Sequence, residues 1–204
     1  MKLVVSAWYP YQHQANAFQQ LVGKPSLERI ALEIVSSTLQ NDVVGPYISL
    51  SMDDDDLPLL GLPSIVEYFH RHYPEKALFP DDIVLRGHAR AFATMIEERF
   101  TRFCVADISS HTGWKRPTWN SASSASELVI TTPPDLEGLV KISEHLGFRY
   151  LAADTPCLAD ALMAALWWTL EDQGRLEELE KHGWLKTWHE RNCTGLPFYR
   201  LAAA

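Results

Sequence analysis

Residues 61–80 constrain the fold of this chain more than any other stretch. Apolar residues at helical spacing predict an amphipathic helix over residues 61–73. They are Ile65, Tyr68, Phe69 and Tyr73. Pro74 predicts the end of this helix, because the residue before a proline disfavours helical backbone. Strand patterns occur only before this stretch and helical patterns dominate after it, so it marks the passage between two kinds of structure.

The region before this helix has the pattern of an α/β domain. Lys2–Ser6 is a short apolar run that predicts a buried strand, and residues 11–22 have the apolar face of a helix. Residues 27–34 alternate apolar and charged side chains, which favours a second strand over a short helix. Strand, helix and strand in this order predict a βαβ unit with a parallel strand pair.

A β-hairpin is predicted to complete this region. Two apolar runs, residues 47–52 and 57–61, are joined by four consecutive aspartates at 53–56. These acids indicate a solvated turn and not a metal site, because contiguous carboxylates lack the alternating spacing of a calcium-binding loop. The histidines also lack metal-ligand spacing, so we expect no metal site.

The rest of the chain predicts helices only. We expect one helix over residues 85–104, one over 135–146, one from 158, and one continuous helix from 176 to about 191. Residues 158–168 are nearly apolar on all sides, which is typical of a buried helix. The sequence thus predicts an α/β domain (βαβ-ββα) at 1–74, a linker at 75–84 and an all-α domain at 85–204.

Charge and composition argue against several classes of partner. The net charge is −8 and there is no block of basic residues, which argues against nucleic acid. No apolar run approaches the ~18 residues of a membrane span. The three cysteines are far apart and include no Cys-x-x-Cys pair, which favours reduced thiols and a cytoplasmic protein.

The order of short motifs resembles the glutathione transferase superfamily over nearly the whole chain. The most specific matches are Y-P-E-x-x-L-x-P-x-D at 73–82 and L-P-F-Y-R at 196–200, supported by C-L-A-D-A at 157–161. The resemblance implies a thioredoxin-like N-terminal domain and an all-helical C-terminal domain. It also implies a homodimer that takes a small molecule, with glutathione as co-substrate and no other cofactor.

The resemblance assigns ligand-binding roles in the N-terminal domain. Tyr9 stands before the proline of the first turn, where relatives place the group that polarises the thiol; aromatic packing is the alternative role. Ser6, at the end of the first strand, is a lesser candidate for the same task. Pro46 stands at the family's cis-proline, where Gly45 offers its backbone to the tripeptide; an ordinary trans-proline is the alternative. Leu62 and Ser64 lie at the helix start that holds the γ-glutamyl end of glutathione.

This helix start departs from the family pattern of Glu-Ser. Gly61 and Leu62 occupy those two positions, so the acidic group and the hydroxyl are missing. The basic residues of the first helix are also replaced, by Gln12, His13, Gln14 and Asn16. Two functions follow: a divergent transferase that conjugates glutathione to a small hydrophobic electrophile, or a non-catalytic scaffold that does not bind glutathione.

In the helical domain the resemblance gives Asp160 a structural role at the start of a buried helix. Cys157 stands where relatives have a serine or threonine cap, and Thr155 is the alternative cap. Trp167 and Trp168 are adjacent on this helix, so at most one of them faces a cleft, and core packing is the favoured role for both.

Overall fold

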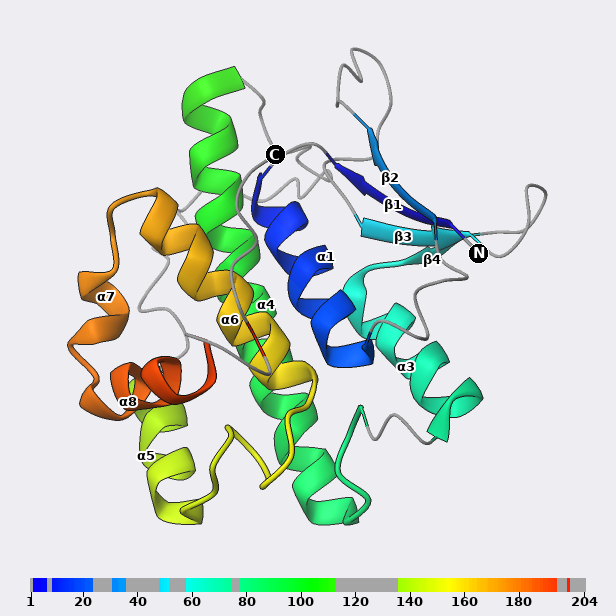
Figure 1. Cartoon of the computed structure of the whole chain (residues 1–204). Helices are drawn as coiled ribbons and strands as arrows, with labels where there is room; N and C mark the ends of the chain where they lie inside the picture. The colour runs from blue at the N-terminus through cyan, green and yellow to red at the C-terminus, as the bar shows by residue number, and fades with distance from the viewer. Residues whose placement is uncertain are drawn as a thin grey trace, which may run out of the picture.

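The computed structural model describes residues 2–6, 9–23, 31–35, 48–51, 58–74, 78–112, 136–193 and 198. Within these ranges a small sheet lies beside a larger group of helices (Figure 1). The domain boundaries at 74 and 85 remain a prediction, since they follow from the pattern of elements.

The N-terminal elements form a four-stranded sheet in the order β2-β1-β3-β4. β1 (Lys2–Ser6) is parallel to β2 (Ala31–Val35) and antiparallel to β3 (Ile48–Ser51), which is antiparallel to β4 (Leu59–Leu60). Helix α1 (Tyr9–Val22) follows β1, and α3 (Leu62–His72) follows β4. The predicted βαβ-ββα order is therefore confirmed. The tip of the predicted hairpin, with its four aspartates, lies outside the described residues.

The C-terminal elements are all helical. They are α4 (Ile83–Thr112), α5 (Leu136–Leu146), α6 (Leu158–Asp172), α7 (Glu177–Glu180) and α8 (Gly183–Asn192). α4 is longer than predicted and begins two residues earlier. Its start is set by Asp82, whose Oδ1 accepts hydrogen bonds from the backbone N–H groups of Val84 at 2.9 Å and Leu85 at 3.0 Å.

The prediction of one continuous helix after residue 176 was wrong. α7 ends at Glu180, and His182 has extended backbone (φ −95, ψ 97) before α8 begins. Leu179 and Trp188 are both buried. These two residues are nine positions apart, so in one straight helix their side chains would point to opposite sides. The break allows both side chains to reach the core, and the apolar pattern alone did not reveal it.

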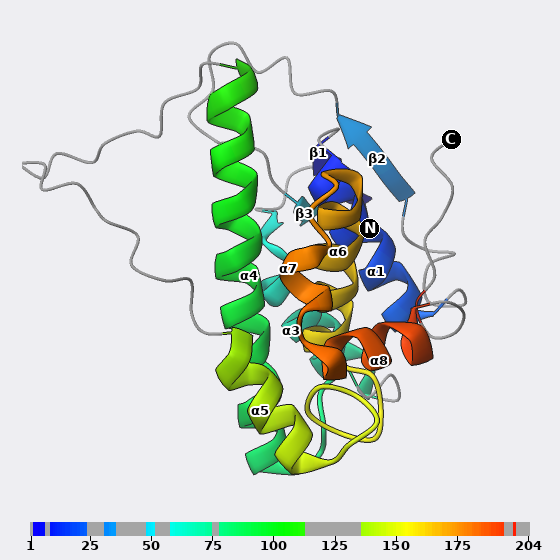
Figure 2. The ribbon, with the colours of Figure 1, turned by 90° about the vertical axis from the view of Figure 1, so that its left-hand side faces the viewer.

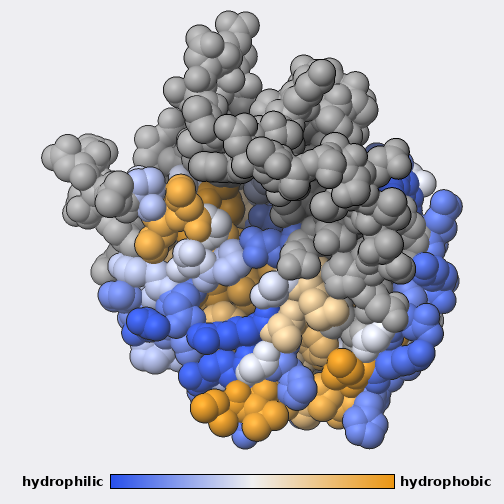
Figure 3. Space-filling model, turned by 180° about the vertical axis from the view of Figure 1, so that it is seen from behind, coloured by the Kyte–Doolittle hydropathy of each residue, from blue (hydrophilic) through white to orange (hydrophobic). Residues whose placement is uncertain are grey.

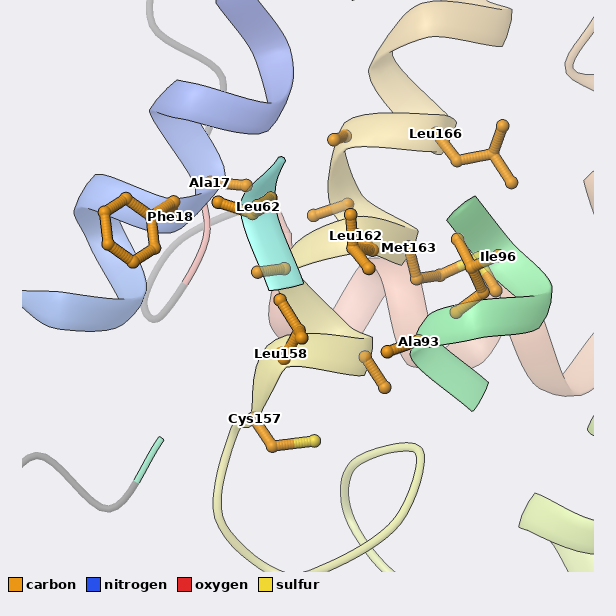
Figure 4. Packing of buried hydrophobic residues seen from close by; sticks show 14 of the residues in the cluster. Ala17, Phe18, Leu62, Ala93, Ile96, Cys157, Leu158, Leu162, Met163 and Leu166 are labelled. Carbon is orange, nitrogen blue, oxygen red and sulfur yellow. The ribbon is translucent and has the colours of Figure 1, made fainter. Parts of the chain in front are cut away.

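Helix α6 is the centre of the molecule. It lies between α4 and α1, and every residue from Leu158 to Leu170 is buried (Figure 2). Trp167 and Trp168 are 2% and 1% exposed, which confirms core packing for both. Figure 4 shows Leu62, from the start of α3, beside α1 and α6 in one continuous apolar cluster. The sheet domain and the helical domain therefore share a core.

The segment that joins the two domains is packed and not free. Leu78 and Phe79 are buried, and the backbone N–H of Leu158 donates to the carbonyl of Leu78 at 3.3 Å. Phe79 contacts one residue of each flanking helix. Its ring centroid is 5.3 Å from that of His70 in α3 and 5.2 Å from Arg90 Cζ in α4. This packing fixes α4 relative to α3.

Candidate functional site

The strand register brings the first residues of α1, β3 and α3 to the same end of the sheet. Val5, near the end of β1, pairs with Ile48, the first residue of β3, and Leu60 at the end of β4 pairs with Ser49. The chain leaves this edge into α1 and α3. The backbone N–H of Gly61 donates to the carbonyl of Ile48 at 2.9 Å, which ties the start of α3 to the start of β3.

The first turn of α3 has backbone N–H groups without acceptors inside the helix. Gly61 is the N-cap with φ 80 and ψ 146, a positive φ that favours glycine, and no side chain caps the helix. Pro63 occupies the first turn, where its missing N–H is not needed. The remaining backbone N–H groups of the first turn, together with the helix dipole, favour the binding of an anion at the N-terminus of α3.

The two predicted ligand residues of α3 have opposite environments. Leu62 has no solvent exposure and packs in the core near Ala17 and Phe18 (Figure 4). It therefore offers a ligand only its backbone. Ser64 is exposed, so its hydroxyl is accessible. Glutathione contact at either residue stays a prediction.

The other predicted site residues are less completely described. Tyr9 is the first residue of α1, which places its backbone directly after the end of β1. Its side chain is not among the described ones. Gly45 and Pro46 lie outside the described residues, just before the start of β3 in the sequence. Their proposed roles are thus untested.

One polar residue of α1, His13, contacts the helical domain. His13 Nε2 lies 2.7 Å from Asp172 Oδ2 of α6, and the His13 ring centroid is 5.9 Å from that of Trp168. Gln14 is 2% exposed, and Gln20 donates to Asn16 at 2.8 Å. The sequence showed only that basic residues were missing here, whereas the structure assigns His13 to a contact between the domains.

Asp160 organises the start of α6. Its carboxylate accepts hydrogen bonds from the N–H of Leu151 at 2.9 Å, the N–H of Cys157 at 3.0 Å and Trp188 Nε1 at 3.1 Å. Cys157 is the N-cap and forms a capping box with Asp160, so Thr155 is not the cap. Burial raises the pKa of Asp160, and these hydrogen bonds oppose that rise. The structural role implied for Asp160 agrees with this arrangement.

The two described cysteines are poor nucleophiles. Cys157 and Cys193 are free and buried. Burial, and then the nearby charge of Asp160, raise the pKa of both thiols well above the usual range. Each therefore stays protonated at neutral pH, and the Cys157 S–H donates a hydrogen bond to Asp160 Oδ2 at 3.2 Å.

The described residues include neither a cluster of metal ligands nor a membrane-spanning helix. No group of three or more His, Cys, Asp or Glu side chains in these ranges is placed to hold a metal ion. Among the same residues, no helix combines the length and apolar character that crossing a bilayer requires.

No protein-family profile matches the sequence, and no curated protein matches it significantly. Solved structures do. A glutathione S-transferase from Sinorhizobium meliloti has a TM-score of 0.60 and 18% identity, over 97% of this chain and 89% of that one. A transferase from Methylobacterium radiotolerans, in complex with glutathione sulfonate, has a TM-score of 0.60 and 16% identity, over 100% and 97%.

The chain has the glutathione transferase fold. A maleylacetoacetate isomerase from Anaeromyxobacter dehalogenans, with dicarboxyethyl glutathione and citrate bound in its active site, shares it at a TM-score of 0.58. Its identity is 17%, over 97% of this chain and 88% of that one. The predicted thioredoxin-like and all-helical domains of the glutathione transferase fold are thereby confirmed.

Proposed function

We propose that this protein binds glutathione at the sheet edge where α1, β3 and α3 begin, and conjugates it to a small hydrophobic electrophile. The observation that carries the proposal is the hydrogen bond from Gly61 to Ile48, which holds two of these starts together. Solved proteins of the same fold are recorded with glutathione or its derivatives bound.

Each predicted residue has a chemical task in this proposal. Tyr9 donates a hydrogen bond to the glutathione sulfur and favours the thiolate, which attacks the electrophile. Gly45, before a cis-Pro46, pairs with the extended tripeptide as an added strand would. The start of α3 holds a carboxylate through its backbone N–H groups and the Ser64 hydroxyl, while Leu62 contributes only its backbone.

A non-catalytic scaffold is the second candidate, and one observation favours it. The start of α3 has neither the acid nor the hydroxyl of the family pattern: Gly61 has no side chain and Leu62 is fully buried. In the scaffold hypothesis the fold is retained for binding or regulation and glutathione does not bind.

Calorimetric titration with glutathione separates the two candidates. We expect measurable heat and a higher melting temperature at saturation, because a ligand that binds only the folded state stabilises it. If millimolar glutathione produces no heat and no rise in melting temperature, the transferase function is ruled out and the scaffold function remains. If glutathione binds, Tyr9→Phe should raise the pKa of the bound thiol. The absorbance of the thiolate as a function of pH measures this pKa. Tyr150→Phe, in the loop before α6, is the control and should leave it unchanged.

We also propose that the protein is a cytoplasmic homodimer. Ile83 and Val84, in the first turn of α4, are 81% and 61% exposed, which is unusual for large apolar side chains. The face seen in Figure 3 carries separate apolar groups among hydrophilic ones. Covering Ile83 and Val84 by a second copy would remove apolar surface from water.

A further inference from the structure

Helix α4 carries apolar residues on two opposite faces. The inner face is buried, and it consists of Ala89, Phe92, Ala93 and Ile96. In Figure 2, α4 stands at the outer edge of the helices, with α6 on its inner side. The outer face of α4, as the term is used below, is exposed and consists of Ile83, Val84, Gly87 and Ala91. A helix face that meets only water normally carries polar residues, so the outer face has the character of an interface.

Gly87 has no explanation within the folded chain. It stands in the second turn of a 30-residue helix, where alanine forms helix more favourably than glycine. A methyl group added at Gly87 would meet no atom within 4 Å, so packing inside the chain does not require a glycine there. A glycine on a helix surface allows another backbone to approach closely. Gly87 therefore marks a point of close approach on the outer face.

The outer face is complementary to itself when two copies of α4 cross antiparallel at Gly87. Ile83 stands four residues before Gly87 and Ala91 stands four residues after it, ~6 Å away along the axis in each direction. The crossing thus brings Ile83 of each copy level with Ala91 of the other. A large side chain meets a small one twice, in the reciprocal manner that a two-fold interface requires.

The charges at the border of this face select the antiparallel orientation. Asp81 and Asp82 are exposed at the start of α4, and the Arg90 side chain is 53% exposed although it also pairs with Glu67 of α3. In the antiparallel crossing, the acidic start of one helix lies within about one turn of Arg90 on the other. A parallel crossing would bring like charges together. Charges at the rim of an interface act mainly on orientation and partner choice.

We propose that a second copy of this chain docks on the outer face, with the two α4 helices antiparallel and their backbones in contact at Gly87. The contact would remove Ile83 and Val84, which are 81% and 61% exposed, from water. The inference rests on the proposed homodimer and adds the contact point and the orientation of the two chains.

Sedimentation of the whole protein over a range of concentrations tests the contact point. Gly87→Leu should raise the dissociation constant of the dimer at least about tenfold, because the added side chain separates the two backbones. Gly87→Ala should also weaken the dimer, yet it should keep or raise the melting temperature of dilute, monomeric protein, because alanine favours the helix. Gly183→Ala is the matched control: Gly183 is exposed in the first turn of α8 with open space around it, and the dissociation constant should not change.

Cysteine cross-linking tests the orientation. One preparation carries Ile83→Cys and the other carries Ala91→Cys, and both are oxidised mildly, first alone and then mixed. The antiparallel crossing predicts covalent dimers in the mixture and few in either preparation alone, because a disulfide forms only between cysteines whose Cα atoms are within ~7 Å.

Three results would overturn the inference, and they separate it from the homodimer itself. A wild-type protein that sediments as a monomer at every concentration would refute both. A dimer whose dissociation constant is the same in wild type and Gly87→Leu would refute the contact at Gly87 and leave the homodimer. Covalent dimers of Ile83→Cys with itself, at the yield of the mixture, would show that the two helices are not antiparallel about Gly87.

Discussion

Removal of the Asp160 carboxylate should destabilise the helical domain more than any other single truncation of a polar group described above. Asp160→Ala would leave three buried N–H donors without an acceptor: those of Leu151 and Cys157 and the indole N–H of Trp188. A buried donor without a partner costs ~1–3 kcal/mol. Structural relaxation and water entry reduce the sum, so we expect a loss of about 3–5 kcal/mol.

Urea denaturation followed by far-UV circular dichroism measures this loss. Asp160→Asn keeps the size of the side chain and one acceptor oxygen, so its loss should be intermediate. Cys157→Ser is the matched control: it keeps the cap and a donor to Asp160, and should change stability by less than about 1 kcal/mol. A loss below about 1 kcal/mol for Asp160→Ala would refute the assigned role of these hydrogen bonds.

Three further outcomes are expected. Glu67→Gln should cost at most ~1 kcal/mol, because its partners Arg71 and Arg90 are well exposed. Burial raises the pKa of Glu67, but these arginines outweigh it and lower the pKa. The contribution of Glu67 to the free energy of unfolding should therefore be present above pH 4.5 and disappear as pH falls. Urea titrations above and below pH 4.5 check this. Glu97→Gln should raise the melting temperature at neutral pH, because partial burial raises the pKa of Glu97 and so disfavours its ionised form in the folded state, and this gain should vanish below pH 4.5. Ile83→Asp should convert a dimer to a monomer in light scattering with unchanged circular dichroism, and a monomeric wild type would contradict the proposed dimer.

Local patterns predicted the elements well where one periodicity dominated. The apolar face of residues 61–73 and the stop at Pro74 correspond to α3, and the all-round apolar run from 158 corresponds to the buried α6. The pattern did not predict the break between α7 and α8. Leu179 and Trp188 are buried because of where neighbouring helices lie, which the spacing of apolar residues along one helix does not encode.

The ligand site was only partly predictable for a similar reason. The sequence identified Leu62 as a residue without a hydroxyl, and the structure added that its side chain is withdrawn into the core. It identified His13 only as a replacement for a basic residue. The contact with Asp172, which is 159 positions away, exists because α1 packs on α6.

The sequence by itself determined the succession of elements: sheet first, helices after, with Pro74 and the apolar run of α6 as the clearest signals. These follow from backbone preference and periodicity, which act over a few residues. Only the tertiary structure decided which polar groups have partners. Asp160 is surrounded by donors and Glu97 has none among the described residues, although both are acids within helices. The difference arises because a side chain's hydration and hydrogen bonds depend on segments that packing brings together from distant parts of the chain.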